Sequence, residues 1–148
     1  MGGTVTVKGD TNLVSDNIVS GKSIFGVVGT ADTSMGDALI ARTLNSVTNE
    51  RVTSIGSYAF AYCSNLTTAN FPNLTDIADF GFYSCKSLTT ISFPKVTNID
   101  RYAFGGCSSL TTANFPECTS IGNYAFFNCS RLYSISFPET TTIGAFAF

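Results

Sequence analysis

The chain of 148 residues contains no histidine, and only 12% of its residues are charged. The absence of histidine excludes a Ser-His-Asp or Cys-His catalytic arrangement, and the lack of Cys-x-x-Cys spacing further argues against a zinc site. The acidic residues are scattered and do not recur as a pair suited to acid–base catalysis. A net charge of −2 provides no basic face for a nucleic acid. We therefore predict a protein without catalytic residues, a bound metal or a cofactor.

Long apolar runs are also missing. No stretch reaches the ~18 consecutive apolar residues that predict a transmembrane helix, so we expect no membrane insertion. The first residues, Met1 to Thr4, lack the positive charges and the apolar run of a secretory signal peptide. If the protein leaves its cell, we expect another export route or a longer native chain.

A repeat of 22 residues dominates the chain from about residue 38 onward. An isoleucine, a phenylalanine, a cysteine, a leucine and a Phe-Pro pair each recur at this spacing. The columns are Ile55, Ile77, Ile99, Ile121 and Ile143; Phe60, Phe82, Phe104, Phe126 and Phe148; Cys63, Cys85, Cys107 and Cys129; Leu66, Leu88, Leu110 and Leu132; and the pairs that begin at Phe71, Phe93, Phe115 and Phe137. A fixed period of this length predicts a solenoid, in which each unit buries its apolar face against its neighbours.

Each repeat is expected to contain one short strand. Leu66, Ala69 and Phe71 alternate with the polar Thr68 and Asn70, which turns one face of this strand inward. The proline that follows closes the strand. The Tyr-Ala-Phe triplet of the repeat should form the opposite wall as a tight turn or a single helical turn. We therefore expect parallel strands on one side of the solenoid and irregular structure on the other.

Two columns alternate between small and large residues along the stack. One column holds Ala69, Ile91, Ala113 and Ile135, and the other holds Ala61, Tyr83, Gly105 and Phe127. We interpret this alternation as staggered packing, in which a bulky coil leans over a small neighbour. A notch for a ligand is the less favoured interpretation.

The five cysteines are predicted to be buried free thiols. Four of them share the column of Cys63, where parallel side chains on coils about 4.8 Å apart suit packing better than bridging. Cys118 falls in another inward column, together with Leu74 and Val96. Free cysteine in such a column behaves as a small hydrophobic residue.

Residues 1–36 do not follow the repeat and are predicted to form a small α+β appendage with a linker. The pattern predicts a strand over residues 4–7, a helix over residues 10–21 that begins with an N-cap, and a strand over residues 24–28. We place the boundary so that residues 37–148 form the solenoid.

The full repeat reads Ile-Gly-x-Tyr-Ala-Phe-x-x-Cys-Ser-x-Leu-Thr-Thr-x-x-Phe-Pro, and the fourth copy matches it closely around Tyr124, Cys129 and Leu132. This string resembles the BspA-like leucine-rich repeat family. The resemblance implies a curved solenoid that serves adhesion or recognition and shares no catalytic site. The predicted fold is a leucine-rich repeat solenoid with 22-residue repeats, short parallel strands on one face, turns or short helices on the other, and a small α+β N-terminal appendage.

A shorter resemblance lies ahead of the repeats. The segment from Asp10-Thr11-Asn12 to Val28-Gly29-Thr30 resembles short modules of bacteriophage and prophage tail proteins. The junction Asp37-Ala38-Leu39-Ile40-Ala41-Arg42-Thr43-Leu44 is similar to one that leads into the same repeats in such proteins. The resemblance implies that residues 1–36 attach or oligomerise while the solenoid faces a bacterial surface.

The outward positions of the predicted strands form the candidate binding face. Their uncharged hydroxyl and amide groups suit sugar hydroxyls or another polar backbone, and Tyr133 supplies a stacking plane. The candidate residues are Thr67, Thr68, Asn70, Thr89, Thr90, Ser92, Thr111, Thr112, Asn114, Tyr133, Ser134 and Ser136. The alternative, that threonine simply favours strands and tolerates water, stays open.

Two other surface features are weaker candidates. Tyr62, Tyr83 and Phe127 are large aromatics on the far wall, where they either anchor a partner or cover the core. Asp79 and Arg101 share a column and are expected to form a surface ion pair worth about 0–1 kcal/mol.

We predict a non-enzymatic binding or structural domain of a phage or prophage tail protein that recognises a bacterial surface. The alternative is a bacterial BspA-like cell-surface adhesin that binds a host or matrix protein. The first interpretation places the chain on a virion tail and the alternative places it on a cell surface, with a cell-surface glycan or protein as the partner. Under the first interpretation, residues 1–36 are the expected route to a homo-oligomer. Because Phe148 stops inside a fifth coil without a polar cap, we also expect the native chain to continue.

Overall fold

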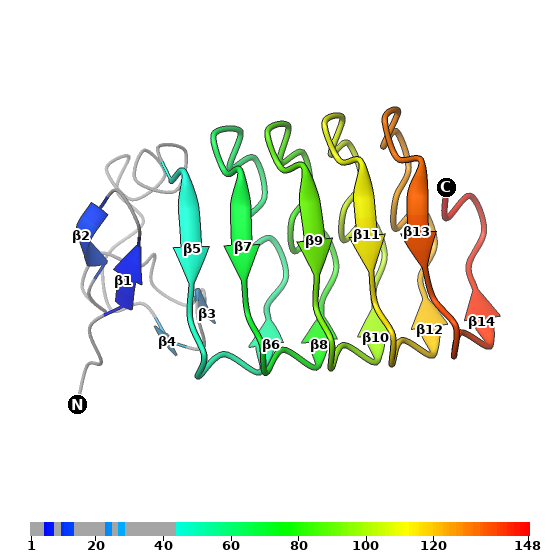
Figure 1. Cartoon of the computed structure of the whole chain (residues 1–148), viewed down its shortest axis with the longest axis horizontal. Helices are drawn as coiled ribbons and strands as arrows, with labels where there is room; N and C mark the ends of the chain where they lie inside the picture. Colours follow the sequence, from blue (N-terminus) through cyan, green and yellow to red (C-terminus); the bar gives the residue numbers. More distant parts are fainter. Residues whose placement is uncertain (1–4, 8–9, 14–22, 25–26, 29–43) are drawn as a thin grey trace.

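The computed structural model describes residues 5–7, 10–13, 23–24, 27–28 and 44–148. Its N-terminal segments form two small antiparallel pairs (Figure 1). Strand β1 (Val5–Val7) pairs with β2 (Asp10–Leu13), and β3 (Ser23–Ile24) pairs with β4 (Val27–Val28).

Two expectations about this region are wrong. Asp10–Leu13, predicted as the start of a helix, is a strand because it pairs with β1. The single strand expected over residues 24–28 is instead divided between β3 and β4, whose pairing supplies the backbone partners that a lone strand lacks. The strand expected over residues 4–7 is confirmed for Val5–Val7. The rest of the predicted helix, the linker and residues 37–43 lie outside the described residues.

Residues 44–148 wind into a solenoid whose coils each add a strand to two parallel arrays (Figure 1). The first array consists of β5 (Ser46–Thr48), β7 (Thr68–Asn70), β9 (Thr90–Ser92), β11 (Thr112–Asn114) and β13 (Ser134–Ser136). The second consists of β6 (Ser54–Ile55), β8 (Asp76–Ile77), β10 (Asn98–Ile99), β12 (Ser120–Ile121) and β14 (Thr142–Ile143). Every pairing is parallel and joins residues 22 positions apart, such as Ile55 with Ile77. The predicted solenoid of 22-residue repeats with short parallel strands is confirmed.

The second array corrects the expectation of irregular structure on the far side. Its strands are only two residues long, and they form one continuous five-stranded sheet within residues 44–148. In the first array, β5 pairs with β7, whereas β9, β11 and β13 form a separate ladder. The isoleucine column lies on this second sheet, with Ile77, Ile99 and Ile121 buried.

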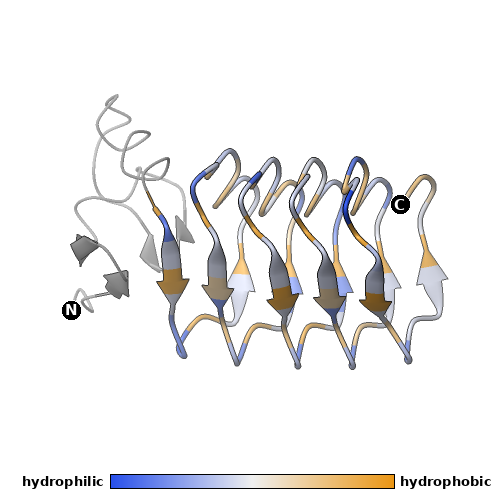
Figure 2. Ribbon diagram, turned by 45° about the horizontal axis from the view of Figure 1, so that its top comes forward, coloured by the Kyte–Doolittle hydropathy of each residue, from blue (hydrophilic) through white to orange (hydrophobic). Residues whose placement is uncertain are grey.

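Apolar columns fill the space between the two arrays. One column consists of the buried rings of Phe60, Phe82, Phe104 and Phe126. Successive rings in this column stack with their centroids 5.0–5.3 Å apart. Phe71, Phe93 and Phe115 form a second buried column beside them. Residues 44–148 include no buried polar or charged side chain. Figure 2 shows that the pattern of hydrophilic and hydrophobic positions repeats from coil to coil.

The third side of each coil consists of turns, and residues 44–148 contain no helix. These turns hold two columns of residues in the left-handed region, represented by Tyr58 (φ 60°) and Tyr62 (φ 64°). The columns are Tyr58, Phe80, Tyr102, Tyr124 and Phe146, and Tyr62, Ser84, Gly106 and Asn128. The turns also bond to one another across coils, since the Phe60 N–H donates to the Gly81 carbonyl at 2.8 Å. This bonding offsets the cost of a left-handed aromatic residue.

Side-chain ladders connect the coils as well. The thiol of Cys107 donates to the Phe82 carbonyl oxygen at 3.2 Å, and the thiol of Cys129 donates to the Phe104 carbonyl at 3.1 Å. All five cysteines are free, and all but the half-buried Cys129 are buried, which confirms the predicted buried thiols. A column of threonines bonds similarly through hydroxyl-to-carbonyl contacts and comprises Thr53, Thr75, Thr97, Thr119 and Thr141.

Candidate binding surfaces

The outward side of the first array carries the residues that were predicted as the binding face, and we call these twelve residues the polar face. The parallel register places Thr90, Thr112 and Ser134 beside one another on adjacent strands. Thr111, Thr112 and Asn114 are half-buried, and the other nine are exposed. Tyr133 is 81% exposed.

Part of the polar face stabilises the solenoid itself. The Thr67 hydroxyl donates to the Asn45 carbonyl and the Thr111 hydroxyl donates to the Thr89 carbonyl, each at 2.9 Å. These two hydroxyls are therefore already engaged in hydrogen bonds within the solenoid. By contrast, the side chains of Thr68, Asn70, Thr90, Thr112, Ser134 and Ser136 make no hydrogen bond with the described residues. Those groups stay available to a partner.

A second surface feature is a ladder of rings on the turn side. We call Tyr58, Phe80, Tyr102, Tyr124 and Phe146 the aromatic ladder. Neighbouring centroids lie 4.7–5.2 Å apart and the ring planes are within 14° of parallel. Because the interior rings cover each other's faces, the ladder presents ring edges to solvent. It is therefore a structural element and a poor platform for stacking a ligand.

Tyr83 and Phe127 cover this ladder. Tyr83 lies edge-on to Phe80 at 5.4 Å, and Phe127 lies edge-on to Tyr124 at 5.6 Å. A Cβ added at Gly105 would meet the Tyr83 ring at 3.2 Å, so the large residue leans over the small one in the next coil. This contact bears out the predicted staggered packing for the column that contains Tyr83 and Gly105.

Asp79 and Arg101 do not form the predicted ion pair. The Asp79 carboxylate accepts the backbone N–H of Arg101 at 3.0 Å. The Arg101 guanidinium instead lies over the Tyr102 ring, 5.3 Å from its centroid. The short carboxylate finds its nearest donor on the next coil's backbone, which leaves the long arginine side chain free to cover the aromatic ladder.

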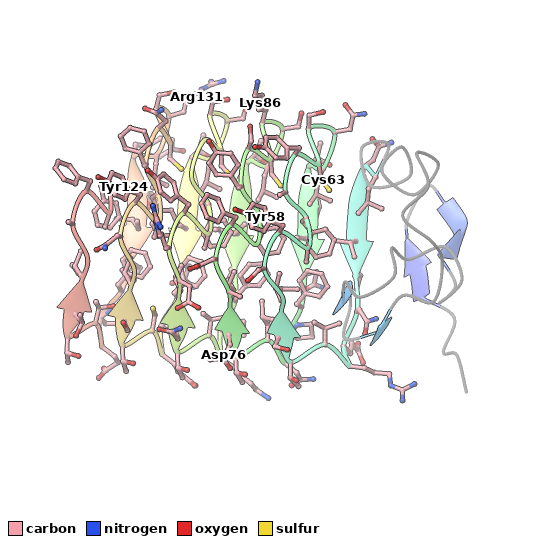
Figure 3. All side chains as sticks on the ribbon, turned by 180° about the vertical axis from the view of Figure 1, so that it is seen from behind. Tyr58, Cys63, Asp76, Lys86, Tyr124 and Arg131 are labelled. Carbon is pink, nitrogen blue, oxygen red and sulfur yellow. The ribbon has the colours of Figure 1, made fainter. Side chains whose placement is uncertain are left out.

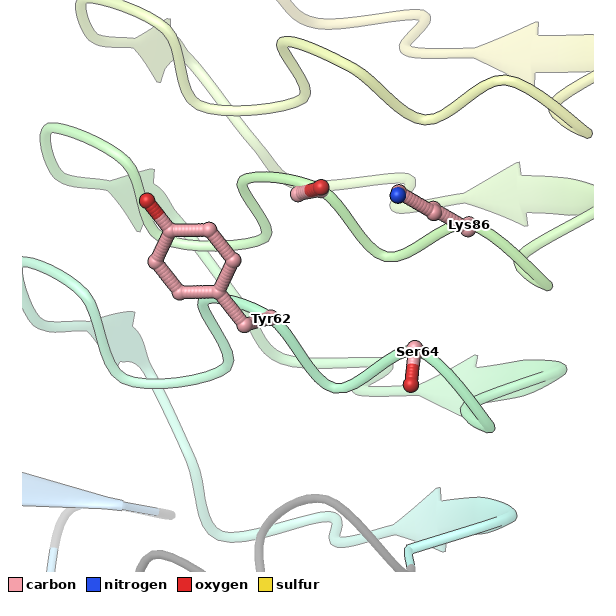
Figure 4. A pocket seen from close by; sticks show the side chains of 4 residues that line it. Tyr62, Ser64 and Lys86 are labelled. Carbon is pink, nitrogen blue, oxygen red and sulfur yellow. The ribbon is translucent and has the colours of Figure 1, made fainter.

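A shallow hollow of about 330 Å³ lies between two adjacent coils on the turn side (Figure 4). Tyr62 and Ser64 line it from one coil, and Ser84 and Lys86 from the next. The sequence analysis did not identify this site, because no repeat contains the combination. The available signal was Lys86, which occupies a column where the other repeats have serine.

A second hollow of about 450 Å³ lies beside the last coil. Its lining is mainly apolar and includes Phe126, Leu132, Ile135 and Phe148, together with Tyr133 of the polar face.

Three further properties of the described residues concern metal binding, thiol reactivity and membrane insertion. They contain no group of three or more side chains that could hold a metal. Burial raises the pKa of the Cys63 thiol to about 12 and also raises the pKa of Cys118, so neither is a ready nucleophile. No helix among the described residues is long and apolar enough to cross a membrane.

Comparison with protein families gives a match to the BspA type leucine rich repeat region, in six copies over residues 41–148. The fold is also similar to the crystal structure of a leucine rich cell surface protein from Faecalibacterium prausnitzii A2-165. The two are 30% identical with a TM-score of 0.62, over 71% of this chain and 36% of that one. This chain thus spans about a third of that protein's length.

A search of curated proteins gave no match. Neither positive comparison shows a phage or prophage module, so that prediction for residues 1–36 rests on the sequence alone. The repeat, the solenoid and the family match over residues 41–148 agree, and the chain belongs to the BspA-type leucine-rich repeat family.

Proposed function

We propose that this chain is a non-enzymatic binding module of a bacterial cell-surface protein, which adheres to a glycan or protein on another surface. The polar face is the observation that carries the proposal. It combines exposed hydroxyl and amide groups, no charge, and one prominent ring at Tyr133. Such groups recognise a polar polymer through many short hydrogen bonds and one stacking contact.

The rigidity of the solenoid supports this role. The backbone under the polar face is held by parallel pairing in register, for example Ala113 with Ile135. Buried phenylalanines lie directly behind it, including Phe93 and Phe115. A surface whose shape is fixed before binding loses less conformational entropy when a partner docks.

The cell-surface interpretation is favoured over the phage-tail interpretation. The relative from Faecalibacterium prausnitzii is described as a cell surface protein, whereas no comparison points to a tail protein. We therefore propose an extracellular, surface-attached location.

The test measures binding of the labelled full chain to an epithelial monolayer and to deposited extracellular matrix. Two matched variants place a carboxylate on an exposed strand residue: Thr90→Glu on the polar face and Ser54→Glu on the opposite sheet. Thr90→Glu should weaken binding at least about tenfold, because an unpaired carboxylate is costly to bury in an interface. Ser54→Glu should stay within about twofold of the parent chain.

Treatment of the surface with protease or with glycosidase before binding distinguishes a protein partner from a glycan partner. Equal binding by both variants and the parent would exclude the polar face as the contact. Failure of the parent chain to bind any of these surfaces would contradict the proposed adhesion.

A further inference from the structure

The loops that lead into the first array carry a positive charge. We call residues 61–66, 83–88, 105–110 and 127–132 the loop edge. Its only charged residues are Lys86 and Arg131. Figure 3 shows both at one side of the solenoid and Asp76 at the opposite side. The acidic residues within residues 44–148 all lie outside the loop edge, at Glu50, Asp76, Asp79, Asp100, Glu117 and Glu139. A small anion is therefore attracted to the loop edge.

The 330 Å³ hollow contains one of these two cations. Figure 4 shows Tyr62 and Ser64 on one coil and Lys86 on the next, around a common opening. Ser64, Ser84 and Lys86 make no side-chain hydrogen bond with the described residues. The hollow therefore offers an ammonium group and two hydroxyls that have no partner within the described part of the chain.

Tyr62 adds an aromatic surface held in a fixed position. Its ring lies edge-on to Tyr83 with centroids 5.5 Å apart, and the residue is 54% exposed. Its backbone is left-handed at φ 64°, in a column where Gly106 and Asn128 suit that conformation better. The Tyr62 N–H donates to the Tyr83 carbonyl at 2.7 Å, so the turn that carries the ring is fixed to the next coil. Unlike the interior rings of the aromatic ladder, this ring is not stacked between parallel neighbours.

We propose that this hollow binds an acidic saccharide, with Lys86 pairing its carboxylate, Tyr62 stacking on its ring, and Ser64 and Ser84 bonding its hydroxyls. One cation matches the single negative charge of each acidic sugar unit, and no carboxylate on the loop edge competes for it. The shared chemistry is that of a sialic acid terminus or a uronic acid chain. The site is separate from the polar face and does not depend on the adhesion proposed above.

The experiment is a nuclear magnetic resonance titration of the full chain with four probes. 3′-Sialyllactose and lactose form one pair, and tetragalacturonate and cellotetraose form the other. We expect at least one acidic probe to bind at least about tenfold more tightly than its neutral partner. The pair that shows the difference identifies the source of the acidic sugar.

Three variants locate the binding. Lys86→Ala should weaken acidic-sugar binding about tenfold, whereas Arg131→Ala removes the same charge from the same edge and should stay within about twofold. Tyr62→Gly should also weaken binding about tenfold, and it is compatible with the fold because Gly106 occupies the same left-handed column. Amide spectra that match the parent chain away from the hollow verify folding.

Several results would overturn the assignment. They are the absence of binding by both acidic probes, equal losses in Lys86→Ala and Arg131→Ala, and binding of tetraglutamate as tight as that of the sugars. The Thr90→Glu variant separates the two proposals. It should retain acidic-sugar binding even where adhesion is lost, and loss of both would show that the hollow is not an independent site.

Discussion

Tyr83 lies over Gly105 of the following coil, where a Cβ would come within 3.2 Å of Tyr83 Cδ2. The glycine leaves room for the ring, and the ring in turn lies edge-on to Tyr102, 6.1 Å away. The alternation of small and large residues along this column therefore reflects contact between neighbouring coils. It also provides a direct test of how tightly the coils fit.

Gly105→Ala should destabilise the solenoid. The new methyl group would approach Tyr102 Cδ1 to 2.9 Å as well as the Tyr83 ring, so both rings must shift. We expect a loss of about 1–2 kcal/mol in the free energy of unfolding, measured by urea denaturation. In a Tyr83→Ala background the same change should cost about 0.5–1 kcal/mol less, because one of the two obstructing rings is gone. Strict additivity of the two changes would contradict the proposed contact.

The aromatic ladder predicts an unusual order of stability at Tyr102. Its ring stacks on Phe80 at 5.1 Å and on Tyr124 at 4.7 Å, and its backbone φ is 53°. Tyr102→Ala should lose about 2–3 kcal/mol through the missing ring contacts. Tyr102→Gly should be about 1 kcal/mol more stable than the alanine variant, because glycine adopts the left-handed conformation without strain. Thermal and urea unfolding give the order, and an alanine variant as stable as the glycine variant would contradict it.

The thiol ladder predicts a gradient of stability effects along the solenoid. The Cys85 thiol is buried and donates to the Phe60 carbonyl at 3.2 Å. Cys85→Ala should therefore cost about 1–2 kcal/mol through the lost packing and hydrogen bond. Cys129→Ala removes a similar bond from a half-buried site and should cost less. Equal losses at the two positions in urea denaturation would show that burial does not set the effect.

Alkaline pH should destabilise the protein through its buried thiols. The pKa of Cys63 rises from about 9 to about 12 because burial disfavours the thiolate. The native state therefore keeps its proton between pH 9 and 12 while the unfolded state releases it, so stability is present below pH 9 and declines above it. The decline should approach about 1.4 kcal/mol per pH unit for this thiol. Urea midpoints at pH 8, 9 and 10 measure it, and Cys63→Ala should show a shallower decline than the parent chain.

The repeat in the sequence predicted the solenoid, its inward columns and its free cysteines. Each of these depends on residue type at a fixed 22-residue spacing, and Leu66, Phe71 and Cys85 are buried where that spacing placed them. A side chain that recurs in every coil has the same neighbour in every coil, so one unit predicts the next. The outward position of the residues of the polar face could be predicted for the same reason.

The short strands of the second sheet could be identified only from the tertiary structure. Ser54–Ile55 is too short to show the alternation by which a strand is recognised, and it exists because Asp76–Ile77 pairs with it. The left-handed backbone of the tyrosines could not be predicted from the sequence either, because steric clashes disfavour that conformation for a bulky residue. It is stabilised here by bonds to the next coil, as between the Tyr58 N–H and the Asp79 carbonyl at 3.1 Å.

The 330 Å³ hollow between adjacent coils is the feature that the sequence predicted least. Its residues, such as Tyr62 and Lys86, break the repeat, and they converge only because stacking places positions of neighbouring coils side by side. The sequence by itself determined that residues 44–148 form a solenoid of 22-residue coils, since periodic burial of apolar side chains admits few other folds. The tertiary structure decided which outward side chains come together, because contacts across coils depend on the turn geometry that positions each side chain.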